Sequence, residues 1–174
     1  MNRASEREGS GQFTPLWPSR RRWRILQGLA IAGLACTAAT TRPRFDPLPG
    51  SLTDTLGAGP GAVIGGLAEE LAAQGLKLHA MSRAEGYLET AWFDPVTRKS
   101  VGQEHRHTER VFRLRAYADS LPPVKSMLSL ETVYRRTADP SADGREEERI
   151  VPPGQPGDSL TQLVLESLRK RFPK

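Results

Sequence analysis

Two long stretches of alternating residues, 109–118 and 126–136, most constrain what this chain of 174 residues can fold into. Successive side chains of a strand point to opposite faces, so a period of two predicts two long antiparallel strands at the centre of a sheet. One face should be buried, and the face that carries arginines should contact water. In the first stretch the apolar face holds Phe112, Leu114 and Ala116, and the polar face holds Arg113, Arg115 and Tyr117.

Two further segments show the apolar spacing of amphipathic helices. The first should begin at Pro60, because proline suits the first turn of a helix, and Gly75 is placed to end it. The second has Asp158 or Ser159 as its expected N-cap, in capping-box spacing with a glutamine, and runs to Phe172. Each helix has an apolar stripe that must be buried, and the apolar face of the sheet is the surface available for it.

Shorter apolar runs supply the remaining strands. Strands are expected at 51–56, on the edge of the sheet, at 76–81 and at 87–93, with polar or charged loops at 96–108 and 138–149. The expected order is therefore β-α-β-β-β-β-α. It predicts an α+β fold in which an antiparallel sheet of four to five strands carries two helices on one face.

With these elements in place, the sequence resembles the small domains of BamC-type lipoproteins, which are accessory parts of outer-membrane β-barrel assembly. The similarity covers residues 51–172. It depends on the antiparallel pair, the closing helix, the end of the first helix at 71–76, and the turn 82–86 that leads into 87–90. The resemblance implies a helix-grip-like domain that binds other proteins.

The N-terminal region has the order of an export signal. Arginines at 20–22 and 24 precede the uncharged apolar segment 25–35, and Cys36, the only cysteine, follows directly. This arrangement resembles a bacterial lipobox, although Gly33 stands where a branched aliphatic residue is usual. The resemblance implies that Cys36 is acylated, and two or three acyl chains would anchor the protein firmly to a membrane.

The alternatives are a signal cleaved near Ala38, an uncleaved anchor helix over 25–41, and a cytoplasmic protein. The apolar segment is shorter than the roughly 20 residues needed to span hydrocarbon, and Arg42 follows it, which argues against the anchor helix. A Pro- and Thr-rich tether should hold the domain away from the membrane. The expected parts are a signal peptide with lipobox over 1–36, including a polar extension over 1–19, a tether over 37–50 and one domain over 51–174.

The net charge of +5 is concentrated before Cys36. Six of the 25 basic residues and two of the 20 acidic ones precede it, so 19 basic and 18 acidic residues form a nearly neutral remainder. Without a basic excess there is no electrostatic footprint for a phosphate backbone, and no nucleic-acid partner is expected. A single cysteine also excludes an internal disulfide, so the fold must depend on its core.

Two patterns that could indicate chemistry each have a commoner structural reading. Residues 57–62 fit G-x-G-x-x-A, but the preceding strand is too polar for a buried parallel strand and antiparallel structure follows. The histidines and glutamates of 104–109, with His79, could supply metal ligands, although solvated histidines are commoner in so polar a loop. No G-x-S-x-G or H-E-x-x-H motif occurs. We therefore expect no cofactor, no metal and no enzymatic activity.

The largest aromatic group of the predicted sheet lies on one strand. Residues of opposite parity face opposite ways, so Trp92 cannot share a face with Tyr87 and Phe93 unless a bulge intervenes. An exposed aromatic beside Arg113 and Arg115 would suit a protein interface, in which aromatics and arginine are enriched. The alternative is that the second helix covers it.

These observations predict a membrane-anchored lipoprotein that faces the periplasm and acts as a protein-binding or scaffold module. Its partners would be the membrane, through the lipid anchor, and an envelope protein. Thr37 follows Cys36 with no aspartate there, which resembles proteins sent on to the outer membrane of two-membraned bacteria. The alternative is a carrier whose sheet and helices enclose a cleft for a lipid or other small apolar ligand, which requires a cavity of about 300 Å³ or more.

Overall fold

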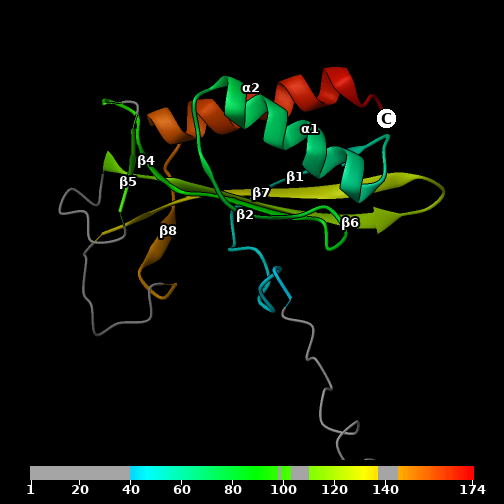
Figure 1. Ribbon diagram of the computed structural model, residues 1–174, viewed down its shortest axis with the longest axis horizontal. Helices are drawn as coiled ribbons and strands as arrows, with labels where there is room; N and C mark the ends of the chain where they lie inside the picture. The colour runs from blue at the N-terminus through cyan, green and yellow to red at the C-terminus, as the bar shows by residue number, and fades with distance from the viewer. Residues whose placement is uncertain (1–39, 98, 103–109, 137–144) are drawn as a thin grey trace, which may run out of the picture. The chain divides into compact units, whose positions relative to one another are not determined.

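The computed structural model describes residues 40–97, 99–102, 110–136 and 145–174. The predicted signal peptide and Cys36 lie outside these ranges. Within them the chain forms an α+β fold in which two helices lie on one face of an antiparallel sheet, which confirms the predicted fold class (Figure 1). No helix of the described part is long and apolar enough to cross a membrane.

The main sheet has the strand order β1-β7-β6-β3-β2, and β8 follows β1 along the same edge of β7. Its central pair is β6 (Arg113–Leu121) and β7 (Lys125–Arg135), as the two alternating stretches predicted. A loop was expected over 138–149, but strand β8 begins at Glu148, so the last two residues of that predicted loop belong to a strand. The other strands of this sheet are β1 (Leu52–Leu56), β2 (Leu78–Ser82), β3 (Tyr87–Thr90) and β8 (Glu148–Ile150).

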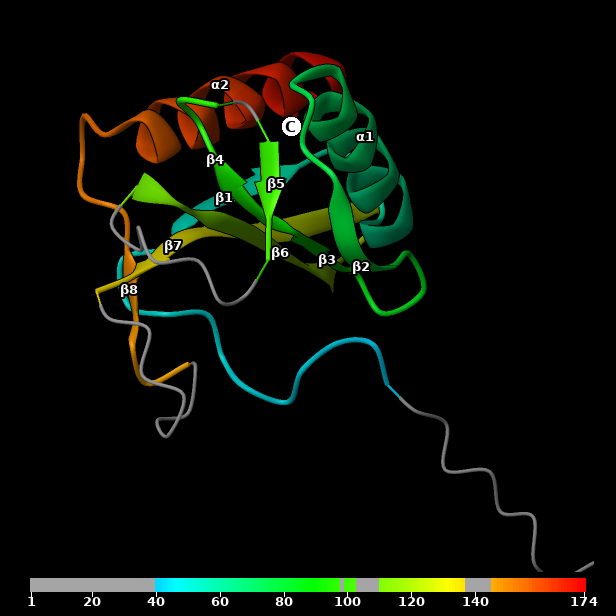
Figure 2. The ribbon, with the colours of Figure 1, turned by 60° about the vertical axis from the view of Figure 1, so that its left-hand side comes forward.

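The strand predicted over 87–93 is divided at Ala91. β4 (Trp92–Asp94) leaves the main sheet and pairs with β5 (Lys99–Val101), a strand that lies in an expected loop. This hairpin rises on the helix side of the sheet (Figure 2). The break changes parity: Phe93 lies in the core beneath the helices, whereas Tyr87 and Trp92 lie on the opposite face. The expectation that Tyr87 and Phe93 share a face is therefore wrong.

Both helices bury their apolar stripes against the sheet. α1 (Pro60–Ala73) begins at its proline, and Gly75 follows its end with φ +80°, as expected. α2 (Pro156–Arg171) has Gln155 as its N-cap without a side-chain cap bond, so the expected capping box at Asp158 or Ser159 is wrong. Pro156 stands in the first turn of α2, as Pro60 does in α1, and this explains why α2 starts earlier than expected.

The core between helices and sheet is aliphatic and fully enclosed. Burying a leucine side chain of this kind stabilises a fold by about 1.5–3 kcal/mol relative to exposure. Phe93 and Phe112 extend the core toward the start of α2, with ring centroids 5.6 Å apart. Residues with no exposed surface include Leu56, Ile64, Leu67, Leu71, Leu88, Leu114, Leu128, Val164 and Leu168.

The C-terminus closes against the edge strand β1. The amide of Gly57 donates to the carbonyl of Phe172 at 3.2 Å, and the Asp54 carboxylate accepts from Arg169 and, at 2.8 Å, from Lys174. The hydrogen bond from Lys174 lowers the pKa of Asp54 from 3.8 to about 2, with help from Arg169 and against the effect of burial.

Gly86, in the β2–β3 turn, should tolerate substitution less well than Gly75. Its φ is +63°, and an added Cβ would collide with the carbonyl oxygen of Ala118. Gly75 has a similar φ of +80° but open space, so Gly75→Ala should cost only the strain of about 1–2 kcal/mol. Urea unfolding should show a loss for Gly86→Ala that is larger by about 1–3 kcal/mol. Equal losses would mean that backbone strain alone limits both positions.

Asp54→Asn should destabilise the protein at neutral pH by about 1 kcal/mol, because its cationic partners are half-exposed. A folded-state pKa below the ordinary 3.8 stabilises the fold above that pH, and the contribution is lost as pH falls toward 2. Unfolding free energies measured between pH 7 and pH 2 should therefore converge for the two proteins. Glu69→Gln, which removes an exposed partner of Arg171, serves as the control and should change little. A gap for Asp54→Asn that is independent of pH would contradict this assignment.

Candidate functional site

The centre of the sheet face away from the helices is buried, so the prediction that its arginines contact water is wrong, although Met127 toward the end of the same face is 42% exposed. Arg113 and Arg115 are 6% and 4% exposed, and Tyr117 and Glu131 are fully buried. The alternation was correct, but two distant segments return to cover this face: residues 40–50, which we call the strap, and residues 145–148. The strap runs along the side opposite to the helices (Figure 2).

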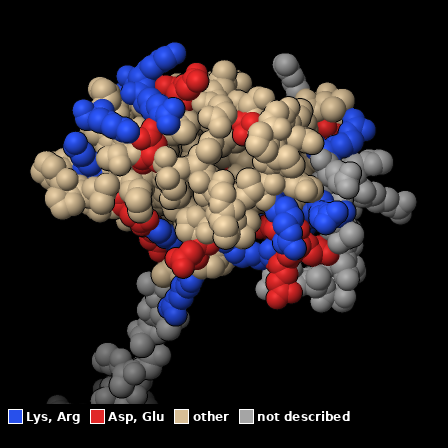
Figure 3. All heavy atoms as spheres, turned by 180° about the vertical axis from the view of Figure 1, so that it is seen from behind, with Lys and Arg blue, Asp and Glu red and all other residues tan. Residues whose placement is uncertain are grey.

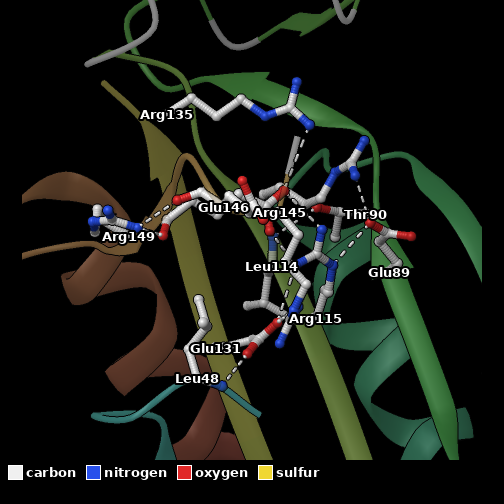
Figure 4. A network of polar contacts seen from close by, with 12 residues as sticks. Leu48, Glu89, Thr90, Leu114, Arg115, Glu131, Arg135, Arg145, Glu146 and Arg149 are labelled. Atoms are coloured by element: carbon white, nitrogen blue, oxygen red, sulfur yellow. Dashed lines mark hydrogen bonds and ion pairs between the residues drawn. The ribbon is translucent and has the colours of Figure 1, made fainter. Parts of the chain in front are cut away.

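The buried charges of this face form a network centred on Arg115 (Figure 4). Its Nε donates to Glu89 at 3.0 Å, its Nη1 to Glu131 at 3.1 Å, and its Nη1 and Nη2 grip both oxygens of Glu148 at 2.5 and 2.9 Å. Bidentate arginine–carboxylate pairs are among the strongest polar contacts in proteins. We call this network the Arg115 cluster, with charged members Glu89, Arg113, Arg115, Glu131, Arg135, Arg145 and Glu148.

Two members of the cluster, Glu89 and Arg115, have pKa values that favour their charged forms in spite of burial. Burial raises the pKa of the Glu89 carboxyl, but the Arg113 and Arg115 guanidinium groups outweigh it and hold that pKa below 4.5. Burial likewise lowers the pKa of Arg115, yet its bonds to Glu148 and the charges around it raise the pKa above its ordinary value. Burial raises the pKa values of Tyr87 and Tyr117, so both phenols stay neutral. These shifts describe a fixed set of charges that hold the fold.

The structure brings four of the five predicted interface residues together, but inside the molecule. Trp92 lies between two guanidinium groups, with the Cζ atoms of Arg113 and Arg135 at 4.5 and 5.0 Å from its ring centroid. The fifth residue, Phe93, packs in the helix-side core. The expectation of an exposed aromatic beside Arg113 and Arg115 is wrong, and Trp92 is covered by Leu48, Val101 and Ile150 and not by the second helix. All five of Tyr87, Trp92, Phe93, Arg113 and Arg115 are at most 6% exposed.

The glutamates of the cluster were missed by sequence reasoning, although two of them left a signal. Glu89 and Glu131 lie directly across from Arg115 in the strand register, on strands that were predicted. Opposite charges at facing positions of neighbouring strands favour an ion pair. Glu148 and Arg145 follow a charged segment without periodicity, so nothing in the sequence pointed to them.

The strap replaces most of the expected free tether with a docked segment. The amides of Thr41 and Arg42 donate to Glu85 Oε2 at 2.8 and 2.9 Å, and the amide of Leu48 donates to Glu131 at 2.8 Å. Farther along, the Arg145 guanidinium stacks on Phe45, with its Cζ 3.4 Å from the ring centroid. Proline-rich composition predicted an extended chain, but the amides of an extended chain can still donate hydrogen bonds to carboxylates of the domain.

Two cavities flank the segment 151–157 that leads into α2. One has a volume of about 310 Å³ and includes Val96, Arg110, Phe112, Tyr134, Arg136 and Gly157 in its lining. We call it the α2 cavity. The other, of about 390 Å³, lies toward β1 and includes Leu52, Leu130, Thr132, Asp158 and Thr161. Both reach the size that a bound small molecule requires.

The other sequence patterns find no support as sites within the described part of the chain. The space beside Gly57 is filled by the carbonyl of Pro173, so this end of the glycine-rich loop faces the C-terminus. His79 is exposed on β2, while the histidines of 104–109 lie outside the described residues. The described residues contain no group of three or more metal-ligating side chains.

Arg115→Met should destabilise the fold by about 3–5 kcal/mol at pH 7, because it leaves buried carboxylates without their central partner. Loss of one of its two guanidinium neighbours raises the pKa of Glu89, so the deficit relative to the parent should shrink as pH falls toward 4.5. Urea unfolding at pH 7 and pH 5 measures both effects. Arg135→Met, which removes a more distant partner of Glu148 at 3.7 Å, is the control and should cost clearly less. A deficit for Arg115→Met that grows in acid would contradict the assigned role.

Comparison with known proteins does not identify a function for this chain. No protein-family model matches the chain, and no curated protein matches it at a significant level. The resemblance to BamC-type lipoproteins and to a lipobox therefore stays a prediction. Because one fold can carry many functions, the α+β architecture alone does not select among them.

Proposed function

We propose that this protein is an envelope lipoprotein, anchored through an acylated Cys36, whose domain is a non-enzymatic module that binds other proteins on the periplasmic side. The strap is the observation that carries this proposal. It connects the predicted anchor to the domain by backbone and side-chain bonds at Glu85, Asp119 and Glu131. A segment that served only as a loose spacer would not need these contacts.

The strap also limits the distance between the domain and the proposed anchor. Thr41, whose amide bonds to Glu85 in the β2–β3 turn, follows Cys36 by only five positions in the sequence. At about 3.3–3.6 Å per extended residue, this length spans at most roughly 18 Å. The domain would therefore be held close to the bilayer, where a membrane-bound partner can meet it.

Two features of the domain support a binding module, one buried and one on the surface. The buried acids of the sheet are held in ion pairs that stabilise the fold, which is a structural use of charge. Figure 3 shows a broad uncharged area between charged side chains that gather near the margins of that face. Leu163 on α2 is also half-exposed. Depletion of charged residues is typical of the centre of a protein interface.

Intact-mass analysis of the detergent-extracted protein, expressed in a two-membraned bacterium, tests the anchor. The mature protein should begin at Cys36 and carry the mass of two or three acyl chains, and Cys36→Ala should lose this mass and remain unprocessed. Thr37→Asp is the matched variant: it should keep the acyl mass but move from the outer-membrane fraction to the inner-membrane fraction. An unmodified Cys36 in the parent protein would overturn the proposal.

A second candidate function, a small-molecule carrier, is favoured by the two cavities beside the start of α2. Their volumes of about 310 and 390 Å³ fall at the lower end of the range for ligand sites. The carrier would use the end of the sheet and would not need the uncharged surface. Anchoring by Cys36 is compatible with either function.

A further inference from the structure

The α2 cavity forms beside a close contact between α2 and the sheet. A Cβ at Gly157 would lie 3.1 Å from the Thr132 methyl group and 3.2 Å from the Phe112 ring, so the first turn of α2 rests directly on the sheet. Beside this contact, β6 begins at Arg113, whereas β7 continues to Arg135. The unequal strand ends leave space that the β4–β5 hairpin and the start of α2 enclose.

The inner wall of the cavity is apolar and held in place. Val111, Phe112 and Val151 line it and are at most 8% exposed. The Phe112 ring meets Phe93 edge-on at 61°, and its amide and carbonyl are both bonded to Phe93. Tyr134 adds a second aromatic ring to the lining. Aromatic walls that are fixed by core packing suit a flat or apolar ligand without prior rearrangement.

The charged groups of the lining are of one sign. Among the described residues of the lining, Arg110 and Arg136 are the charged ones, and none is an aspartate or glutamate. The negative charge of Asp94 interacts electrostatically with Arg110, but the Asp94 carboxylate accepts a hydrogen bond from the amide of Val96 at 2.8 Å. The start of α2 has no side-chain cap and has the partial positive charge of a helix N-terminus, while Asp158 in the same first turn lines the neighbouring cavity. The described residues that line that neighbouring cavity include no lysine or arginine.

We propose that the α2 cavity binds a small organic anion with an aromatic or apolar body. The acid group lies at Arg110 and Arg136, and the body lies against Phe112 and Tyr134. Guanidinium groups bind carboxylates with two parallel hydrogen bonds, which orients such a ligand. This inference refines the carrier candidate by naming its ligand class, and it does not depend on acylation of Cys36.

Titration of the full-length protein in a non-ionic detergent with 4-phenylbutyrate, followed by NMR, tests the proposal. The matched probes are 4-phenylbutan-1-ol, which is neutral, and 4-phenylbutylamine, which is cationic. The acid should shift the amide signals of Phe112, Tyr134 and Gly157 and should saturate them. The alcohol should bind more weakly and the amine most weakly. Equal binding of all three probes, shifts away from these residues, or no saturation by the acid would each overturn the proposal.

Variants of exposed residues separate the cavity from the rest of the surface. Arg110→Gln should weaken binding of the acid by about tenfold, because it removes a charge-assisted hydrogen bond. Val96→Asp adds a negative charge to the lining and should also weaken it. Val124→Asp is the control, because Val124 is 69% exposed in the β6–β7 turn, against 67% for Val96, and does not line the cavity. Equal effects of Val96→Asp and Val124→Asp would contradict binding at the α2 cavity. The acyl mass on Cys36 is independent of all these results.

Discussion

The buried guanidinium of Arg115 is the interaction on which one whole face of this protein depends. A charge taken out of water destabilises a fold unless it is paired and hydrogen-bonded. Arg115 meets this condition only because Glu89, Glu131 and Glu148 reach it from three different strands. The cluster therefore couples β3, β6, β7 and β8, and it ties the placement of the short strand β8 to the centre of the sheet.

The sheet consequently has two cores of different chemistry. On the helix side, leucine and valine side chains exclude water without directional bonds, and α1 and α2 cover them. On the other side, ion pairs and stacked arginines fill the space, and a chain segment without secondary structure covers them. A strap can close a polar face because its backbone amides bond to carboxylates, which an apolar face does not offer.

The helices cover one face of the sheet and the strap covers the centre of the other, so the proposed binding sites lie at the margins of the domain. The α2 cavity lies at one end of the sheet, where β7 outruns β6, and the strap reaches the β2–β3 turn at Glu85. The proposed membrane attachment and the proposed ligand site thus use different parts of the molecule. Either can operate without disturbing the buried charges between them.

The sequence by itself determined the elements whose signal is local. Period-two alternation predicted β6 and β7 and the face of each of their side chains, and Pro60 and Gly75 marked the ends of α1. The sequence also identified Trp92, Arg113 and Arg115 as candidate interface residues. It missed β5, β8 and the break at Ala91, because strands of three residues are too short for a periodic pattern.

Only the tertiary structure decided which surface is wet. Leu48 bonds to Glu131 across 83 residues of sequence, and Arg145 bonds to the carbonyl of Asp46 across 99. Local hydropathy does not reveal such contacts. The sequence of a polar strand face is the same whether its side chains form hydrogen bonds with water or with a distant segment of the chain. The residues predicted to form an interface are therefore buried in the fold, each at most 6% exposed. The cavity beside α2 likewise arises from the relative lengths of paired strands, which depend on register and not on composition.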